Sequence, residues 1–169
     1  MLKTVCLSAF FLTVTGCYNP FSPKLDQSEG DVPFITEQRT PDEFFQNFLY
    51  AYTFKDSLVY SDLLDSSFTF QYFNPDAGES GAFDSWRRNI ELKTTGRLLR
   101  SFETIDLTWY RIFFSNDISE NEKKIYRDFR LMLVGGNENI SLFGSALFTL
   151  VRSDDNKWRI KLWVDETNY

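Results

Sequence analysis

Hydrophobic residues recur at helical spacing early in the chain and mainly at strand spacing later. From residue 40 to about residue 54, apolar side chains fall three or four positions apart, as they do on one face of a helix. Thr40, Pro41 and Glu43 supply an N-cap, a first helical residue and a capping box. The pattern predicts a helix that begins at residue 40, and a shorter helix near residues 58–64.

Two further elements are predicted in the middle of the chain. Residues 67–73 alternate between polar and aromatic side chains, as a strand does. The turn-rich stretch at 74–81 is expected to be a loop. A helix is expected near residues 84–100, with Asp84 or Ser85 as its cap.

The last third of the chain predicts a run of long strands. Its separators, SNDISENE, GGNE and SDDN, are rich in turn residues. Such short connections join antiparallel neighbours, because a parallel pair needs a crossover of about a dozen residues or more. The whole order predicts an α+β fold, with three helices on one face of a curved, mainly antiparallel sheet. A small lipocalin-like barrel is the alternative. The strands are expected near residues 102–114, 123–134, 139–152 and 157–165.

The amino-acid composition limits the kinds of functional site that the chain can form. Eighteen Phe, eight Tyr and four Trp in 169 residues indicate a core or pocket built from rings. The formal charge of −6 disfavours nucleic acid as a partner, because phosphate binding needs a concentrated basic surface. The chain has no histidine, and both cysteines, Cys6 and Cys17, lie near its start. We therefore expect no metal site, no cofactor and no thiol nucleophile in the body of the chain.

The first 17 residues resemble the signal peptide of a bacterial lipoprotein. Lys3 is followed by a short apolar run, and Val14-Thr15-Gly16-Cys17 resembles the lipobox of that family. The resemblance implies cleavage before Cys17 and lipid on that cysteine, which would hold the mature protein on a membrane. An ordinary secretory signal is the alternative. Residues 17–38 contain three prolines and are expected to be a flexible tether, so that the folded domain spans residues 39–169.

The lipobox also predicts where the protein resides. A lipidated cysteine implies the cell envelope. Tyr18, which follows it, is not the aspartate that retains some enterobacterial lipoproteins in the inner membrane, and this favours the outer membrane.

The body of the chain resembles the nuclear transport factor 2-like superfamily, whose fold is also described as a cystatin-like α+β cone. The resemblance covers about residues 40–165 and rests on TPDEFFQNFLYAYTFKD, LLDSSFTFQYF, SWRRNIELKTTGRLL and the closing ALFTLVRSDDNKWRIKLWVDE. It implies a sheet folded around a cone-shaped pocket with an apolar floor, and often a homodimer formed through the outer face of the sheet. Members include isomerases, dehydratases and cyclases beside many non-catalytic binding domains, so the fold alone decides no function.

Catalysis would need particular groups in the cone. The family members that rely on histidine are excluded as models. A catalytic pair of a carboxylate base and a tyrosine donor is still possible. Asp62 or Asp106 would be the base, and Tyr72 is among the candidate donors. We favour the interpretation that the tyrosines pack in the core and that Asp62 is exposed to solvent, without a catalytic role. For Glu91 we expect a salt bridge with Arg87 or Arg88 on a solvated helix face.

Large aromatic side chains are the candidates for lining the pocket. In the last strand, Trp158 and Ile160 are expected to face the core, while Trp163 is expected on the outer face together with Tyr110. That outer face would then make a partner surface for a second copy or an envelope protein. The predicted pocket residues are Phe48, Tyr52, Phe68, Tyr72, Trp86 and Trp109.

Three functions follow from these features. The first is a membrane-anchored, non-catalytic module with an aromatic-lined pocket for a small apolar ligand. The second is a pocket enzyme that transfers protons on a hydrophobic substrate, and the third is a structural envelope protein with a filled core. We rank them in that order, because the anchor and the aromatic excess favour binding while the usual catalytic residue types are missing.

Overall fold

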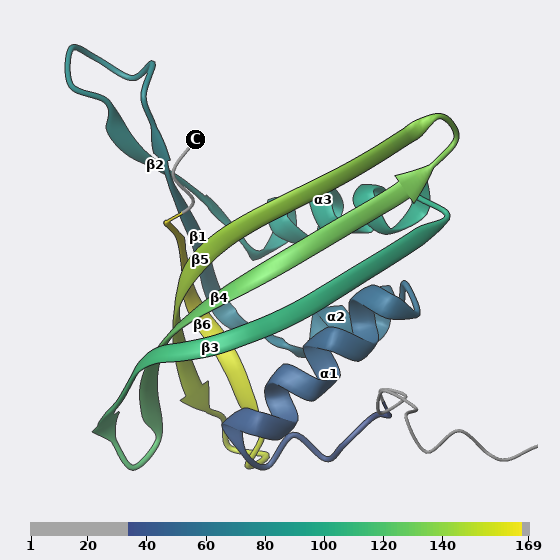
Figure 1. Ribbon diagram of the computed structural model, residues 1–169. Helices are drawn as coiled ribbons and strands as arrows, with labels where there is room; N and C mark the ends of the chain where they lie inside the picture. Colours follow the sequence, from purple (N-terminus) through teal and green to yellow (C-terminus); the bar gives the residue numbers. More distant parts are fainter. Residues whose placement is uncertain (1–33, 167–169) are drawn as a thin grey trace, which may run out of the picture. The chain divides into compact units, whose positions relative to one another are not determined.

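The computed structural model describes residues 34–166, and within them three helices lie against one face of a strongly curved sheet (Figure 1). The helices are α1 (Pro41–Thr53), α2 (Ser57–Asp62) and α3 (Arg88–Ser101). The predicted signal peptide, Cys17 and most of the predicted tether lie outside the described residues. No helix in the described part of the chain is long and apolar enough to cross a membrane.

The sheet has six strands in the order β2-β1-β6-β5-β4-β3. Neighbouring strands are antiparallel except β1 and β6, which run parallel and are joined along the chain by α3 and four strands. The α+β class and the mainly antiparallel sheet are therefore confirmed. The strands are β1 (Leu64–Asn74), β2 (Ala82–Arg87), β3 (Thr104–Ser119), β4 (Glu122–Gly135), β5 (Glu138–Arg152) and β6 (Trp158–Asp165).

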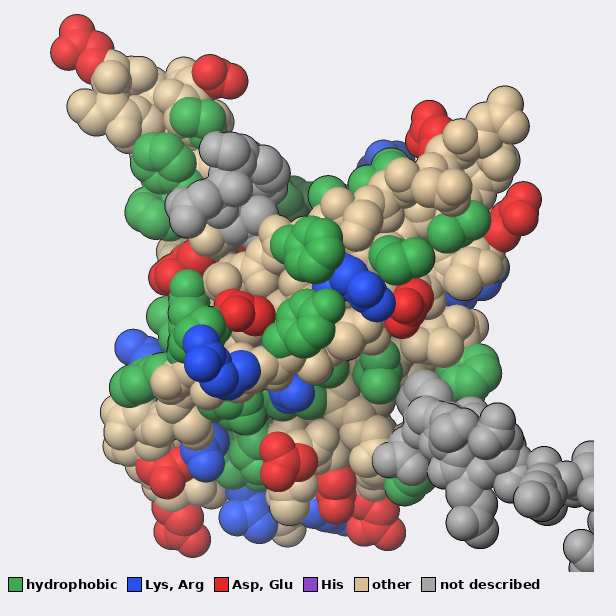
Figure 2. Space-filling model, in the orientation of Figure 1, with side chains coloured by type: hydrophobic (Ala, Val, Ile, Leu, Met, Phe, Trp, Pro, Cys, Tyr) green, Lys and Arg blue, Asp and Glu red, His purple; other side chains and the backbone are tan. Residues whose placement is uncertain are grey.

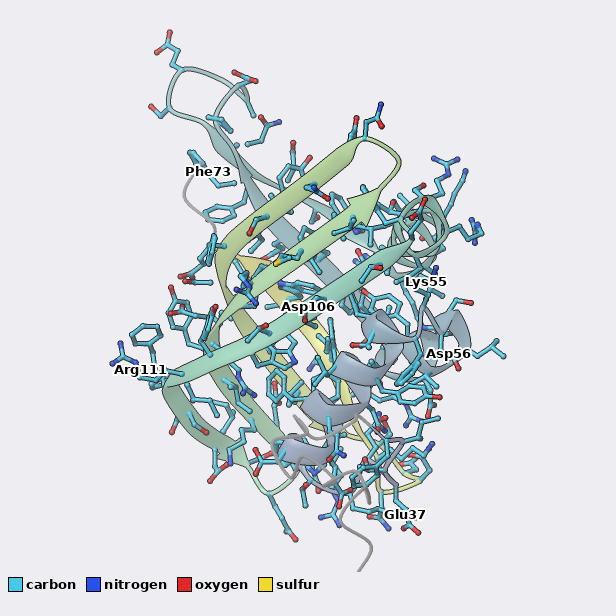
Figure 3. The ribbon with its side chains drawn as sticks, turned by 45° about the vertical axis from the view of Figure 1, so that its right-hand side comes forward. Glu37, Lys55, Asp56, Phe73, Asp106 and Arg111 are labelled. Carbon is cyan, nitrogen blue, oxygen red and sulfur yellow. The ribbon has the colours of Figure 1, made fainter. Side chains whose placement is uncertain are left out.

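The start of α1 follows the sequence signals. The Thr40 hydroxyl accepts a hydrogen bond from the backbone N–H of Glu43 at 3.2 Å, as an N-cap does. The Glu43 carboxylate reaches one residue further back than expected, where it accepts from the Arg39 N–H at 2.5 Å. The helix ends before Lys55, which has a left-handed backbone with φ of 56°. Asp56, beside Lys55 in Figure 3, then caps α2.

The predicted helix near residues 84–100 begins later, at Arg88. Residues 82–87 form β2 instead, paired antiparallel with β1 so that Trp86 lies opposite Phe70. Neither Asp84 nor Ser85 is a cap, and the cap position is Arg87. Pairing with a neighbouring strand overrode the local helix signals, as tertiary context often does.

Other strand boundaries also differ from those expected. β3 continues to Ser119, so most of the separator SNDISENE is strand, and the hairpin turn is confined to residues 120–121. β1 begins at Leu64, three residues before the predicted start. In β3 the ladder with β4 extends pairing into residues that are individually poor strand formers, and β1 begins where Leu64 pairs with Ile160 of β6.

The folded unit begins before residue 39. Asn47 of α1 accepts hydrogen bonds from Thr36, one of them from its backbone N–H at 2.7 Å. The Gln38 side chain is 2% exposed and donates to the carbonyl oxygen of Trp158 at 2.7 Å. The predicted tether is therefore shorter, because its last residues pack on the domain.

A bulge reverses the predicted faces of β6. Thr149 and Leu150 of β5 pair with Leu162 and Ile160, which leaves Lys161 as an extra residue. Because side chains alternate along a strand, one extra residue moves every later side chain to the other face. Trp163 therefore lies on the inner face, with its ring 5.2 Å from that of Phe148, and its predicted place on the outer face is wrong.

Candidate functional site

The inner face of the sheet carries two groups of rings that differ in exposure. The first group, the ring floor, is sealed between α1 and the sheet, and none of its side chains is more than 3% exposed. The second group, the aromatic wall, packs against that core but stays partly exposed. The ring floor comprises Phe44, Phe45, Phe48, Phe68 and Phe148, and the aromatic wall comprises Tyr72, Trp86, Trp109, Phe129 and Trp163.

The predicted pocket residues divide between these groups. Phe48 and Phe68 belong to the ring floor, and Tyr52, only 5% exposed, stacks on Phe48 at 5.1 Å. The other three, Tyr72, Trp86 and Trp109, belong to the aromatic wall. The structure thus brings the six to one face of the sheet but seals half of them in the core.

Ring contacts connect the wall to the floor. Trp109 on β3 and Trp163 on β6 both contact Phe48, with centroids 5.3 and 5.7 Å away. Phe70 stacks on Trp86 at 4.4 Å and meets Trp163 edge-on at 5.2 Å. Such stacked and edge-to-face pairs stabilise the cluster beyond the area that they bury. The wall therefore rests on a rigid base.

Glu91 of α3 is a buried carboxylate that anchors one end of the wall. It is 4% exposed, and its Oε1 accepts hydrogen bonds from the Tyr60 hydroxyl at 2.5 Å and the Thr95 hydroxyl at 2.7 Å. Its Oε2 accepts from the indole N–H of Trp86 at 2.7 Å. The predicted salt bridge of Glu91 with Arg87 or Arg88 on a solvated face is wrong.

Arg88 has different partners. Its guanidinium donates to the carbonyl oxygens of Leu64 and Ser61, at 3.3 and 2.8 Å, and so fastens α3 to the end of α2. A signal for the burial of Glu91 was present in the sequence. Glu91, Thr95 and Leu99 follow one another at four-residue intervals, and Leu99 is a core residue.

The two tyrosines beside Glu91 stay protonated, and Tyr60 donates to its carboxylate. Burial, followed by the charge of Glu91, raises the pKa of Tyr52 well above its ordinary value. Burial likewise raises the pKa of Tyr60, with further contributions from Tyr52 and Glu91. Both hydroxyls therefore keep their protons over the whole physiological range.

Two indole N–H groups of the wall have no such partner. The Nε1 atoms of Trp109 and Trp163 are buried and make no hydrogen bond in the described structure. Most buried polar groups in folded proteins are paired, so each exception calls for a physical reason.

The residues predicted as a base and its partner lie apart. Asp62, at the end of α2, forms ion pairs with Lys157 at 2.6 Å and Arg159 at 2.8 Å. Partial burial raises its pKa, but the hydrogen bonds and charges of these two cations outweigh burial and leave the pKa below its ordinary value. A base that works near neutrality needs the opposite shift.

The other two candidate catalytic residues, Asp106 and Tyr72, have different neighbours. Asp106, near the start of β3 (labelled in Figure 3), is 52% exposed in its side chain and lies 3.6 Å from Arg130. The Tyr72 hydroxyl donates to Asp84 at 3.5 Å. The structure therefore assembles no catalytic pair from Asp62, Asp106 and Tyr72.

The structure has two surface recesses, and only the second includes a residue of the aromatic wall, Phe129. One, of about 720 Å³, is bordered by the start of β1, Arg88, Arg159 and the turn between β5 and β6. The other, of about 260 Å³, includes Tyr110, Phe143 and Ser145 on the outer face. Within residues 34–166, no group of three or more acidic, Cys or His side chains is arranged to hold a metal ion.

Figure 2 shows hydrophobic side chains gathered over the outer face of β3, β4 and β5, interspersed with charged ones. Tyr110, Phe113 and Phe143 are 43%, 49% and 63% exposed. Phe113 lies against Tyr126, and the Arg111 guanidinium lies 4.1 Å above the Phe113 ring. The outer face therefore keeps apolar area available even though Trp163 is not part of it.

The chain matches no known family model and no curated protein. Solved structures do match. A putative scytalone dehydratase from Novosphingobium aromaticivorans is 18% identical and superimposes with a TM-score of 0.63 over 79% of this chain and 85% of its own. A domain of unknown function with a cystatin-like fold from Nostoc punctiforme is 13% identical, with a TM-score of 0.55 over 75% and 74%.

A third match is an NTF-2 like protein of unknown function from Shewanella oneidensis. It is 12% identical, with a TM-score of 0.54 over 73% of this chain and 93% of its own. Likeness at such low identity speaks to the fold and not to the chemistry. Residues 34–166 of this chain have the nuclear transport factor 2-like, cystatin-like α+β fold.

Proposed function

We propose that the protein is a non-catalytic binding module of the bacterial cell envelope, held on a membrane by lipid on Cys17, which takes a small apolar molecule at the aromatic wall. The observation that carries this proposal is the contrast between the sealed ring floor and the partly exposed aromatic wall on the same inner face. Large rings left partly open on a concave face offer contact area to a ligand, and ligand sites are mostly apolar concave surfaces.

The end of the inner face formed by the hairpin of β4 and β5 is open to a ligand. Ile140 and Leu142 of β5 pair with Leu133 and Leu131, which are buried on the inner face. Directly paired residues point to the same side of a sheet, yet Ile140 and Leu142 are 37% and 46% exposed. The helices therefore leave this end of the inner face uncovered.

The charged groups favour binding over catalysis. Asp62 and Asp106 are engaged with cations at the surface. Both oxygens of Glu91 are occupied by neutral donors, and Glu91 is sealed from solvent. A general base must reach a substrate proton, and neither the two ion-paired surface aspartates nor the sealed Glu91 is exposed to a substrate on the aromatic wall.

The membrane anchor rests on the sequence. Lys3, the apolar run after it and the Val14–Cys17 motif together have the form of a lipoprotein signal. Lipid on Cys17 would place the aromatic wall at the surface of a membrane of the cell envelope, with the outer membrane favoured.

We further propose that the outer face docks a second copy of the chain, because it exposes aromatic area over three adjacent strands. Light scattering on the detergent-solubilised full chain should then give the mass of a dimer. Phe143→Glu should shift that mass to a monomer, while Leu58→Glu, at a still more exposed apolar side chain on α2, should not. A monomeric wild type would contradict this docking.

Native mass spectrometry of the intact chain, released from detergent, tests the ligand. We expect a bound apolar molecule of small mass on the wild type, and loss of this adduct in Leu142→Glu, which places a charge at the uncovered end of the inner face. Phe143→Glu, the next residue but on the outer face, is the matched control and should keep the adduct. Loss of the adduct in Phe143→Glu alone, or absence of any adduct combined with no saturable uptake of added fluorene, would contradict the proposal.

A further inference from the structure

The smaller of the two surface recesses, here called the outer recess, is lined by both rings and carboxylates. Its volume of about 260 Å³ lies below the roughly 300–1,000 Å³ of pockets that hold whole small molecules. In the described part of the chain, no lysine or arginine lines it. The outer recess therefore suits a single cationic side chain. It is lined by Tyr110, Asp128, Phe129, Phe143, Gly144, Ser145 and Glu166.

The two carboxylates of the outer recess carry charge that no neighbouring cation balances. Asp128 accepts a hydrogen bond from the Ser145 hydroxyl at 2.7 Å, and the backbone N–H of Glu166 donates to the Ser145 carbonyl oxygen at 2.9 Å. Within residues 34–166, neither Asp128 nor Glu166 forms an ion pair. Two carboxylates in one recess repel each other, so a cation that enters it lowers the electrostatic energy.

Arg111, labelled in Figure 3, is an exposed cation of the same face and has no acidic partner. Its guanidinium lies 4.1 Å above the Phe113 ring, and it forms no ion pair with another described residue. Arg130, by contrast, is engaged by Asp106 and by the Thr108 hydroxyl. A planar guanidinium both pairs with carboxylates and stacks on rings, so Arg111 matches the chemistry of the outer recess.

A bulge in β3 places Arg111 beside the outer recess. The ladder with β4 shifts by one residue between Trp109 and Ile112, so Tyr110 and Arg111 both lie opposite Asp128. Tyr110 lines the recess, whereas Arg111 lies over a neighbouring ring. A cation and an acidic recess are therefore adjacent on one exposed face. A two-fold contact between copies needs this arrangement, because each residue then meets the same site of the other copy.

From this arrangement we infer that the outer recess is a docking site for an arginine side chain, and that its occupant is Arg111 of a second copy. The inference rests on the docking of a second copy proposed above and names the contact that holds the pair. The partner subunit's Arg111 pairs with Asp128 and Glu166 and stacks on the Phe143 ring, and the same contact recurs on the other side of the two-fold axis. Such charge pairs fix how the two copies are oriented.

Charge reversal tests the contact. Arg111→Asp and Asp128→Arg each place like charges against each other at both ends of the pair, so we expect the dissociation constant of the dimer to rise about a hundredfold. Light scattering on the detergent-solubilised full chain, over a range of concentrations, gives this constant. Arg97→Asp, the same reversal at an exposed arginine on α3, is the matched control and should leave the dimer intact.

A mixture of the two variants shows whether the pair forms between copies or within one chain. The Arg111→Asp chain and the Asp128→Arg chain present opposite charges to each other at both contacts. We therefore expect a mixed dimer, although neither variant dimerises alone at the same concentration. Native mass spectrometry identifies the mixed dimer, because the two variants differ in mass. An ion pair within one chain would give no such recovery, because each variant then keeps its own like charges.

The outcomes separate this inference from the proposed docking. Single variants that dimerise like the wild type, or a mixture that stays monomeric, overturn the inference and leave docking through the outer face standing. If Asp128→Arg loses the near-ultraviolet signal of the folded chain, Glu166→Arg, at an exposed acid of the same recess, takes its place in the mixture. A monomeric wild type overturns both the inference and the docking, while ligand binding at the aromatic wall is tested separately.

Discussion

Glu91 brings a carboxylate into the interior without a basic residue among its hydrogen-bond partners in the described structure. Burial of a carboxylate is costly unless hydrogen bonds replace its water. Tyr60, Thr95 and Trp86 supply those bonds from α2, α3 and β2. The cluster therefore ties three elements together and fixes the Trp86 ring in the aromatic wall.

Removal of one donor should measure the strength of this cluster. Tyr60→Phe removes the hydroxyl that donates to Glu91 and keeps the ring, so we expect the free energy of unfolding to fall by about 2 kcal/mol, as for other hydrogen bonds to buried charges. Urea denaturation gives the value. Tyr110→Phe, on the exposed outer face, should change it by less than about 0.5 kcal/mol. Equal effects of the two substitutions would contradict the assignment.

Asp62 joins α2 to the hairpin between β5 and β6 through Lys157 and Arg159. Its pKa is lower in the folded chain than its ordinary value, so the ion pairs stabilise the fold above the ordinary carboxylate range near pH 4. This contribution is lost as pH falls through the lowered pKa. Because the Asp62 side chain is 43% exposed, solvent screening keeps the contribution at about 1 kcal/mol or less.

The corresponding prediction concerns pH. Asp62→Asn should lower the urea midpoint at pH 7, and the gap from wild type should close as pH falls well below 4. Asp106→Asn, at a more exposed carboxylate with a longer ion pair, is the control and should show little gap at either pH. A gap for Asp62→Asn that persists or widens in acid would show that the ion pairs are not its cause.

Individual residues also show why parts of the site could not be predicted from the sequence. The spacing of Glu91 with Thr95 and Leu99 marked its side of α3, but its contact with Trp86 had no signal. Residues 84–100 were expected to form one helix, and only the pairing of β2 with β1 brings the two side chains together. Conversely, the roles of Thr40 and Pro41 could be predicted, because capping is local and depends on adjacent residues alone.

Among the elements, β6 shows the limit of pattern-based prediction most clearly. Its alternation predicts two faces, but alternation holds only while the ladder is regular, and the extra residue Lys161 breaks it. No local signal in the sequence marks that bulge. The helix pattern of α1 carried more information, because an amphipathic helix of 13 residues repeats its signal several times.

Deletion of Lys161 tests the role of the bulge. Without the extra residue, Ile160 and Leu162 would follow one another opposite Leu150 and Thr149, and Trp163 would stay opposite Phe148 on the inner face. We therefore expect the ring cluster to persist and the stability to change little. Thermal unfolding and the near-ultraviolet signal of the tryptophans report the change. Deletion of Gly78, which lies in the open loop between β1 and β2, should likewise be tolerated. Loss of the wild-type tryptophan signal without Lys161 would contradict the assigned faces.

At the scale of the whole molecule, the fold class could be predicted, because short turn-rich separators leave few ways to connect four long strands. The parallel contact between β1 and β6 closes the sheet around the rings and depends on contacts across about 90 residues. Whether the rings fill the cone or leave part of it open also depends on such distant contacts. For that reason the division into ring floor and aromatic wall had no signal in the sequence.

The membrane anchor is a separate prediction at this scale. Cells grown with labelled palmitate should incorporate the label into the full chain, and Cys17→Ala should abolish it because the acceptor thiol is gone. Cys6→Ala, within the part of the signal that is discarded, should keep the label. Label on Cys17→Ala, or none on the wild type, would contradict lipidation at this residue.

The central claim is that the aromatic wall, and not the sealed core, receives the apolar ligand. The chain has four tryptophans, so a nitrogen–proton correlation spectrum of the full chain shows four indole N–H signals that single Trp→Phe variants assign. On titration with fluorene, the account predicts saturable shifts for Trp86, Trp109 and Trp163 and none for Trp158. Equal, non-saturating shifts of all four signals, or no shift at any, would contradict it.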